Sequence, residues 1–163
     1  MFAVGDYIAH PMHGAGVIDS LVTKKINGAE REYYVLRLPS EGMRVLVPVL
    51  GCEDIGVRPI IESSGAKAVL DTFSDIEVSL TQNWNKRYRE NMQRLKSGDL
   101  YEVAHVVKSL MHRERQRGLS TGERKMLHNA KQILMSEIVL SAKTDYGNTE
   151  ARVDRAMMQI PIP

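Results

Sequence analysis

The stretch Lys24-Lys25-Ile26-Asn27-Gly28-Ala29 decides the fold of the first part of this chain. Its Asn-Gly pair tolerates the positive φ values that a two-residue hairpin turn requires. Residues 17–23 before the turn and 32–38 after it are rich in β-branched or aromatic side chains, which is typical of strands. Further strands are expected at 7–9 and 43–47. So few short strands avoid open edges only by curling into a small barrel or by pairing with another chain.

The pattern changes to a helical period after about residue 60. Capping signals give the expected boundaries of the helices. Helices are expected from a cap at Ser63 through Phe73, from near Trp84 to Ser97-Gly98, from a cap at Asp99 to Gly118, after the capping box Ser120–Glu123, and more weakly from Thr149 to Gln159. The sequence therefore predicts an α+β protein with a small strand-rich domain over residues 1–60 and an all-helical domain over residues 61–163.

Charge is distributed unevenly along the 163 residues, whose formal net charge is +2. Residues 83–142 hold twelve Lys or Arg against six Asp or Glu, whereas residues 61–82 hold one against four. Basic charge concentrated in one segment is expected of a surface that binds a polyanion such as nucleic acid. An ordinary solvated helical surface would give the same count, so charge alone leaves both interpretations open.

Several classes of protein are disfavoured by missing motifs. The sequence has no glycine-rich phosphate loop, no zinc helix with paired histidines and no nucleophile elbow. His10 and His13 form the one close histidine pair, for which a turn or strand-end role is favoured over metal binding, and Cys52 reads as a small buried side chain. We therefore expect no enzyme activity, no cofactor and no metal. The start of the chain resembles no signal peptide and no apolar run approaches ~20 residues, so a cytoplasmic protein is expected.

Trp84, the chain's one tryptophan, has two interpretations. Trp84, Tyr88, Met92 and Leu95 follow one another at helical spacing, which favours an ordinary core stripe. Against this, Trp84 lies in the first helical turn beside Lys86, Arg87 and Arg89. An indole in such a place could stack on an exposed base or wedge into an opened minor-groove step while the cations hold phosphates.

Ordered blocks along most of the chain resemble the bacterial CarD/CdnL transcription regulators. The blocks are Val4-Gly5-Asp6, Pro11-Met12-His13-Gly14-Ala15-Gly16, residues 24–28, Glu32-Tyr33-Tyr34-Val35-Leu36, Val47-Pro48, Gly56-Val57-Arg58, Asn83-Trp84-Asn85-Lys86-Arg87-Tyr88, Ser97-Gly98-Asp99 and residues 117–127. The N-terminal part also resembles the polymerase-interaction module of the transcription-repair coupling factor. Departures occur at His10, at Leu46 and over residues 50–53, which concern individual contacts and leave the Trp84 block intact.

The resemblance implies a Tudor-like or SH3-like barrel that docks on the β subunit of bacterial RNA polymerase, and a helical domain that contacts promoter DNA. Trp84 would wedge into the minor groove at the upstream edge of the bubble, with Lys86, Arg87 and Arg89 on the DNA backbone, and so stabilise the promoter open complex. Polymerase contacts are expected from Lys24, Ile26, Arg44, Val45, Leu46 and Pro48. Because Pro48 cannot donate to a ladder, the 43–47 strand is expected at an edge that a polymerase strand could extend.

Two other functions remain open at this point. In a sequence-specific helix-turn-helix factor, the turn at residues 117–120 would precede a recognition helix whose base-reading side chains are Glu123, Arg124, Lys125, His128 and Asn129. In an adaptor that binds only proteins, the barrel and the helices would each contact a partner chain. Binding to promoter DNA with and without polymerase separates the three.

Overall fold

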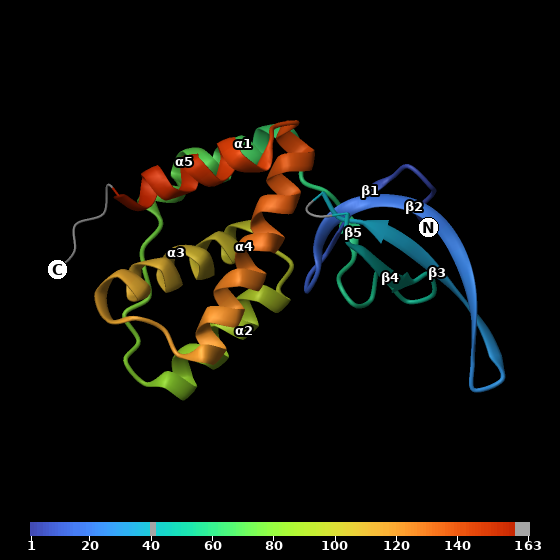
Figure 1. The fold of residues 1–163 in the computed structure, drawn as a ribbon, viewed down its shortest axis with the longest axis horizontal. Helices are drawn as coiled ribbons and strands as arrows, with labels where there is room; N and C mark the ends of the chain where they lie inside the picture. The colour runs from blue at the N-terminus through green and yellow to red at the C-terminus, as the bar shows by residue number, and fades with distance from the viewer. Residues whose placement is uncertain (40–41, 159–163) are drawn as a thin grey trace.

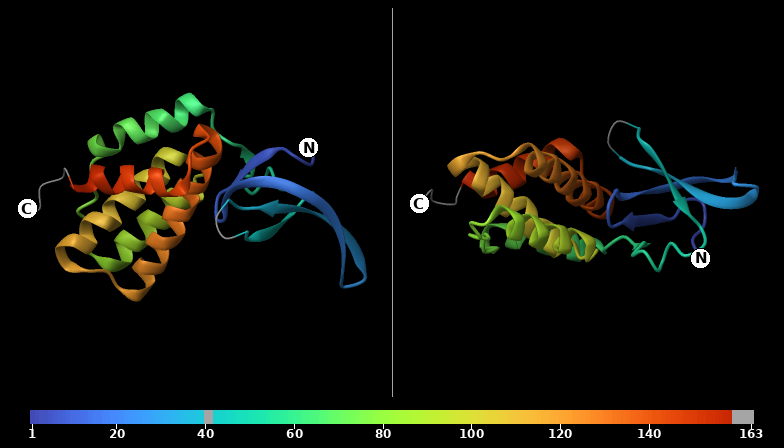
Figure 2. Two further views of the ribbon diagram at one scale, coloured as in Figure 1. Left: turned by 45° about the horizontal axis from the view of Figure 1, so that its top comes forward. Right: turned by 90° about the horizontal axis from the view of Figure 1, so that it is seen from below.

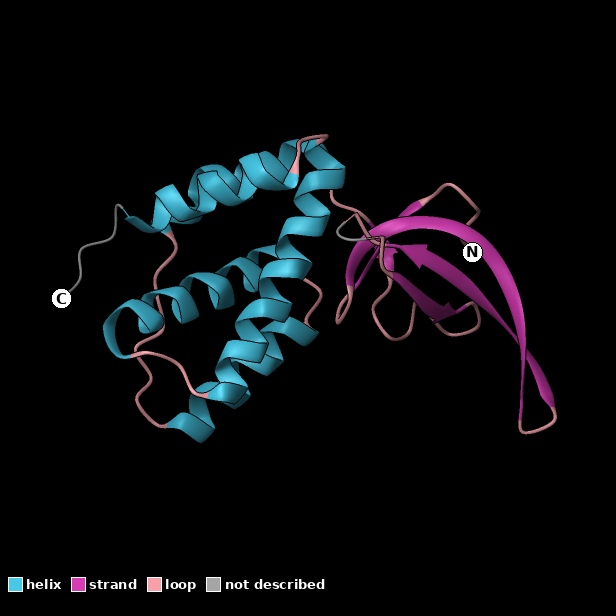
Figure 3. Cartoon of the chain, viewed as in Figure 1, coloured by secondary structure: helices cyan, strands magenta, loops and turns pink. Residues whose placement is uncertain are grey.

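A computed structural model describes residues 1–39 and 42–158, and in it strands and helices occupy opposite ends of the molecule (Figures 1 and 3). The strands come first in the chain: β1 (Tyr7–His10), β2 (Gly14–Ile26), β3 (Ala29–Arg37), β4 (Arg44–Pro48) and β5 (Arg58–Pro59). The helices follow: α1 (Ser63–Thr72), the short 3-10 helix η1 (Phe73–Asp75), α2 (Trp84–Lys96), α3 (Leu100–Arg117), α4 (Thr121–Ala142) and α5 (Tyr146–Met158). The predicted α+β class, with a strand-rich first part and a helical remainder, is confirmed.

The strands form one antiparallel sheet in the order β4-β3-β2-β1-β5. At the β2–β3 turn, Asn27 and Gly28 have φ values of 50° and 81°, which confirms the predicted hairpin. The outer half of this hairpin projects beyond the rest of the sheet as an arm, away from the helices (Figure 2). A bulge between Ile18 and Ser20 interrupts the pairing of β2 with β3 where the arm begins. The edge position expected for the strand before Pro48 is also confirmed, because β4 ends the sheet.

Most helix boundaries follow the capping residues that the sequence indicates. The side chains of Asn83, Asp99 and Ser120 accept backbone N–H bonds at the starts of α2, α3 and α4. The cap expected at Ser63 was wrong, because α1 already includes Ser63 and its N-cap is Glu62, whose side chain makes no capping bond. The last helix begins at Tyr146 rather than Thr149, and its expected end at Gln159 lies outside the described residues.

Two separate hydrophobic cores support the two ends of the molecule. Inside the curved sheet lie Ile8, Ile18, Tyr34, Leu36, Leu38, Val47, Cys52 and Val57, so the buried position expected for Cys52 is confirmed. The larger core lies among the helices and includes Phe73, Leu95, Val107, Leu134 and Ile138. Helix α4 runs past the sheet and down to the start of α2, so it contacts both ends of the molecule (Figure 1).

Candidate nucleic-acid interface

Trp84 begins α2 and is not a core residue. Its side chain is 42% exposed, and one face of the indole stacks on Tyr88 with ring centroids 5.0 Å apart and planes 18° from parallel. The face of α2 that is buried carries Arg87, Asn91 and Leu95 instead. The core interpretation of Trp84 is therefore wrong, and the exposed part of the indole is open to a flat partner.

Ser120 holds the polar edge of the indole. The indole Nε1–H donates to Ser120 Oγ over 3.0 Å. The same oxygen accepts the backbone N–H of Glu123 over 3.2 Å and donates to the Glu123 carboxylate over 3.2 Å. The Ser120 hydroxyl is thus a cap for α4 and a hydrogen-bond acceptor for Trp84 at once, which joins the starts of two helices that are distant in sequence.

Arg87 does not lie where the sequence predicts a DNA contact. Its guanidinium is buried and forms two hydrogen bonds with the Glu123 carboxylate, 2.7 Å from Nε and 3.2 Å from an Nη atom. It also donates to the backbone carbonyls of Thr81 and Gln82, over 3.1 and 3.0 Å. We therefore correct the expected role of Arg87: its charge is used inside the protein, where it fixes the segment that leads into α2.

Glu123 is the acidic partner in this buried pair and is only 2% exposed. Burial favours the neutral carboxyl, but hydrogen bonds and charge from Arg87, together with hydrogen bonds from Ser120, outweigh burial and lower the pKa of Glu123 below its ordinary value. The ionised carboxylate therefore holds Arg87 and Ser120 together at neutral pH. Burial excludes Glu123 as a base-reading residue of a helix-turn-helix. The capping box also differs from expectation, because the Glu123 carboxylate accepts hydrogen bonds from the Arg87 and Ser120 side chains rather than from the Ser120 backbone.

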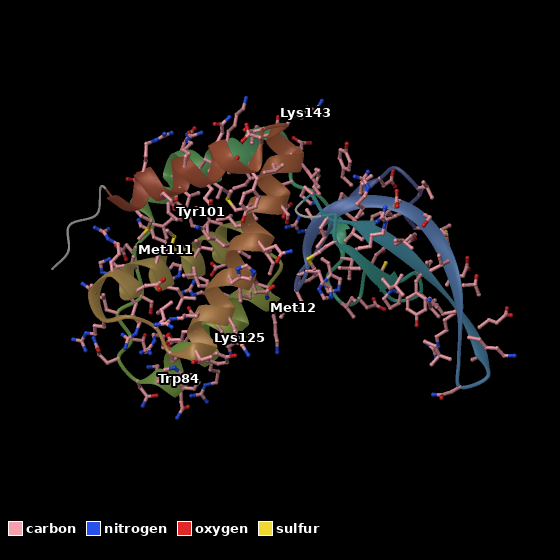
Figure 4. The ribbon with its side chains drawn as sticks, in the orientation of Figure 1. Met12, Trp84, Tyr101, Met111, Lys125 and Lys143 are labelled. Carbon is pink, nitrogen blue, oxygen red and sulfur yellow. The ribbon has the colours of Figure 1, made fainter. Side chains whose placement is uncertain are left out.

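Exposed cations lie near the starts of the two helices that hold the indole. Lys86 and Arg89 are exposed on α2, as expected, and share a helix face because they are three residues apart. Arg124 and Lys125 are exposed on the first turns of α4, and Figure 4 places Lys125 and Trp84 at the same end of the helical region. Lys125 follows Gly122 by one turn, and a Cβ on Gly122 would lie 3.7 Å from the Trp84 ring. Sequence spacing gives no sign that residues 124 and 125 lie at the same end of the molecule as residue 84. They were therefore predicted only as candidate base readers.

Electrostatics at this end of the molecule favour an anion. The N-termini of α2 and α4 meet here, since Trp84 opens one helix and bonds the cap of the other. Helix N-termini carry partial positive charge and unpaired backbone N–H groups, which add to the charge of the exposed cations. An aromatic face beside several cations and two helix starts can take a nucleobase and its neighbouring phosphates.

The predicted polymerase residues fall on the sheet, and the strand register determines which side each one faces. Cross-strand partners project to the same face. Leu46 pairs with Val35, and Val35 pairs with Ser20, so these three side chains share one face. Alternation along β2 from Ser20 puts Lys24 and Ile26 on this face as well.

We call this side the outer face, and it carries five of the six predicted residues: Lys24, Ile26, Arg44, Leu46 and Pro48. Ile26 and Leu46 are 45% and 44% exposed, which is a large exposure for apolar side chains. Arg44 is also exposed and donates to Asp19 over 3.2 Å. Val45 differs from the other five, because it points to the opposite face and packs against the core of the sheet.

The histidine pair lies at the end of β1, beside the helical region. The His10 and His13 rings are 4.5 Å apart, and the Met12 backbone N–H donates to His10 Nδ1 over 3.0 Å. Burial and the neighbouring His13 lower the pKa of His10 to about 4. Within residues 1–39 and 42–158, no group of three or more His, Cys, Asp or Glu side chains could hold a metal ion. In the same part of the chain, no helix has the length and apolar character needed to cross a membrane.

Comparison with known proteins gives matches over nearly the whole chain. Residues 2–61 match the model of the CarD-like/TRCF RID domain, and residues 68–154 match that of the CarD C-terminal domain. A Bacillus subtilis (strain 168) protein named "Putative transcription factor YdeB" is 34% identical over 138 residues, which cover 85% of this chain and 90% of that protein. The first match contains every strand, and the second contains α2, α3, α4 and most of α5.

Proposed function

Because the chain belongs to the CarD family of transcription factors, we propose that it docks on the β subunit of bacterial RNA polymerase and stabilises the promoter open complex. The proposed docking unit is residues 1 to about 60, and the proposed DNA-binding unit is the helical remainder. Trp84 is the proposed wedge in the minor groove at the upstream edge of the bubble. The protein acts by binding, without a cofactor and without catalysing a reaction.

The half-exposed, immobilised indole carries this proposal. Tyr88 covers one face of the Trp84 ring and Ser120 binds its N–H, so the ring is held in one orientation before any DNA arrives. A preordered aromatic side chain loses little conformational entropy on binding. Opened DNA offers an unstacked step that the exposed part of the ring can cover, whereas closed duplex does not. Such differential binding shifts the promoter equilibrium toward the open state.

Lys86, Arg89, Arg124 and Lys125 are proposed to bind phosphates around the wedge. All four are exposed near the starts of α2 and α4, whereas Arg87 is occupied by Glu123. Phosphate contacts release counterions whatever the nearby bases, so these residues would add affinity on every promoter. Base reading by α4 is disfavoured because Glu123 is buried.

Docking is proposed to use the outer face of the sheet together with the free edge of β4. An exposed edge strand can pair with a strand of a partner, and neighbouring apolar side chains then fill pockets beside the new pairing. Leu46 and Ile26 offer such side chains, with Lys24 and Arg44 next to them. One partner surface can therefore contact β4 and the hairpin arm at the same time.

The lifetime of the open complex tests the proposal. In Trp84→Ala, loss of base stacking worth roughly 1 to 3 kcal/mol should shorten this lifetime about five- to a hundred-fold. Capture of polymerase should stay near the wild-type level. Tyr101→Ala is the matched control, because Tyr101 is a similarly exposed aromatic residue at another place on the helices (Figure 4). A well-folded Trp84→Ala protein with an unchanged lifetime would rule out the wedge.

Electrophoresis of promoter DNA separates the proposed function from its rivals. Polymerase-dependent binding supports it, and sequence-selective binding by the protein alone favours the helix-turn-helix factor. No effect on DNA in either condition favours an adaptor that binds only proteins. A chain of residues 61–163, which lacks the sheet, tests the docking unit separately. We expect it to fail to capture polymerase.

A further inference from the structure

An ion pair joins the sheet to the helices. Arg58 on β5 donates to both carboxylate oxygens of Glu137 on α4, over 2.6 and 2.9 Å, and also to the Gly98 carbonyl over 3.1 and 2.8 Å. Glu137 is 1% exposed, although it is a charged residue, and it lies in the last third of a long helix. A paired guanidinium and carboxylate with two parallel bonds accept a narrow range of orientations, unlike an apolar contact, which can slide.

The segment between sheet and helices is tied to α4 as well. The backbone N–H of Ile61 donates to Glu137 over 2.7 Å, and Ser141 on the next turn donates to the Ile61 carbonyl. Residues 60–62 are the whole connection from β5 to α1. Both polar groups of the Ile61 backbone are thus bound by one helix, so the connection does not behave as a free linker.

A close backbone approach forms a second contact between sheet and helices. At Gly14, φ is 92° and an added Cβ would lie 2.5 Å from Ser136 Oγ and 3.2 Å from Ile133 Cα, so only glycine allows β2 to come this near to α4. The neighbouring Ala15 N–H donates to Ser136 Oγ over 2.9 Å, and this bond is buried. Two contacts on one helix, at residues 133–136 and at residues 137–141, restrict rotation as well as separation.

The same helix that touches the sheet also holds the indole. Helix α4 starts at the Ser120 cap, which binds Trp84, and reaches Glu137 roughly 25 Å away at 1.5 Å per residue. A continuous helix transmits orientation along its length. The direction of the Trp84 ring relative to the sheet is therefore determined by how the Glu137 end is held.

We propose that Arg58 and Glu137 are positioning residues that fix the angle between the polymerase-docking sheet and the DNA-contacting helices, so that a docked chain presents Trp84 at one place on the promoter. The proposal rests on the function proposed above. It adds that polymerase affinity and the presence of Trp84 are not sufficient to stabilise the open complex, because the indole must also reach the correct base-pair step of the promoter. Misplacing a functional group by about 1 Å can reduce the effect of that group by about a hundred-fold.

Two conservative variants test this proposal in the full-length chain. Glu137→Gln keeps size and a hydrogen-bond acceptor but removes the charge, and Arg58→Lys keeps the charge but removes the paired donors. Residual dipolar couplings of backbone amides measure the relative orientation of sheet and helices without reference to function. Arg152→Gln is the matched control, because it breaks an exposed ion pair with Asp71 that lies within the helical region.

We expect the two variants to keep the folded amide spectrum of each region and to capture polymerase within about two-fold of wild type, while the open-complex lifetime falls at least about five-fold. Their couplings should no longer fit a single alignment for sheet and helices, as those of wild type and Arg152→Gln should. A single alignment or an unchanged lifetime in both variants would overturn the proposal. If Trp84→Ala also leaves the lifetime unchanged, the proposed function has failed rather than the positioning pair alone.

Discussion

The end of the molecule around Trp84 and the outer face of the sheet present apolar surface in opposite ways. Around Trp84, a single aromatic ring is held by a chain of polar contacts through Ser120, Glu123 and Arg87. On the outer face, Ile26 and Leu46 are exposed on strands, and what organises them is backbone pairing rather than side-chain bonds. The first surface is organised around one aromatic ring, and the second extends along one face of the sheet.

This difference teaches where mutations should act. A ring held by a buried ion pair depends on groups that never touch the partner, so mutations behind the ring should affect both folding and binding. A strand face spreads its contacts over side chains that stand independently, so each mutation there should weaken binding without changing the fold. The variants below test this contrast, and each has a control that differs from it in one respect.

The largest effect is expected from Arg87→Met. It leaves the buried Glu123 carboxylate without its partner, which should lower the free energy of unfolding by about 3 to 5 kcal/mol in urea denaturation. Arg89→Met, an exposed neighbour, should stay within about 0.5 kcal/mol of wild type. A stable Arg87→Met protein that binds DNA with a weaker salt dependence would restore Arg87 to the phosphate-contacting role.

The next effect concerns the outer face. Leu46→Asp should weaken capture of polymerase about ten-fold, because it puts a charge in an apolar contact. The matched control is Leu21→Asp, which is equally exposed but follows Ser20 by one residue and so points to the opposite face of β2. Pull-down with titrated polymerase measures both. Equal losses in the two variants would mean that polymerase capture depends on both faces of the sheet rather than on the outer face.

A smaller effect is expected at the acceptor of the indole bond. Ser120→Gly removes the acceptor of the Trp84 N–H yet keeps a residue tolerated at a helix N-cap, so stability should fall by only a few tenths of a kcal/mol. Loss of one hydrogen bond that orients the ring should shorten the open-complex lifetime about two- to five-fold. Ser120→Thr keeps the hydroxyl and should behave like wild type. If the open complex were as short-lived with the Thr variant as with the Gly variant, the Trp84–Ser120 hydrogen bond would not contribute to its lifetime.

The effect with the smallest consequence at neutral pH is a pH dependence of stability that arises at the sheet. His10 Nδ1 accepts the Met12 N–H and must be unprotonated, and the folded pKa of His10 is lowered from 6.5 to about 4. Below pH 6.5 the unfolded chain therefore binds a proton at His10 that the folded chain does not bind. The free energy of unfolding falls as the pH is lowered from 6.5 to about 4. Urea denaturation of His10→Asn, which keeps an acceptor, should show a shallower decline across this window. His128→Asn is the control, and equal slopes in all three proteins would exclude His10 as a source.

The strand pattern and the helix ends were predictable because they depend on neighbours in sequence. Asn27-Gly28 determines its turn by backbone conformation alone, and Asp99 caps α3 through an N–H two residues away. Ser63 misled because a serine before a helical pattern is a good cap only when its own backbone is extended, and here the helix starts one residue earlier. Such local signals locate elements but not their partners.

The candidate interface was harder to predict because its supporting contacts are long-range. Trp84, Tyr88 and Leu95 suggested a core stripe, yet the buried face of α2 is offset toward Arg87 and Asn91. A buried arginine is favourable only with a partner, and that partner, Glu123, is 36 residues away. The family resemblance pointed to Trp84 as a wedge, which stays a proposal, and the sequence pattern treated Arg87 as one more surface cation although it is buried.

The unequal lengths of the two strands in the arm have a further consequence. From the pair Ile18–Leu36 to the pair Ile26–Ala29, β2 takes eight residue steps and β3 takes seven, so one residue of β2 must be left over. The surplus falls at Asp19, where the bulge adds bend and twist to the arm. Deleting Asp19 would equalise the strands and straighten the arm, while every residue beyond it keeps its cross-strand partner. The direction in which the arm points and the chemistry of its tip can therefore be varied independently.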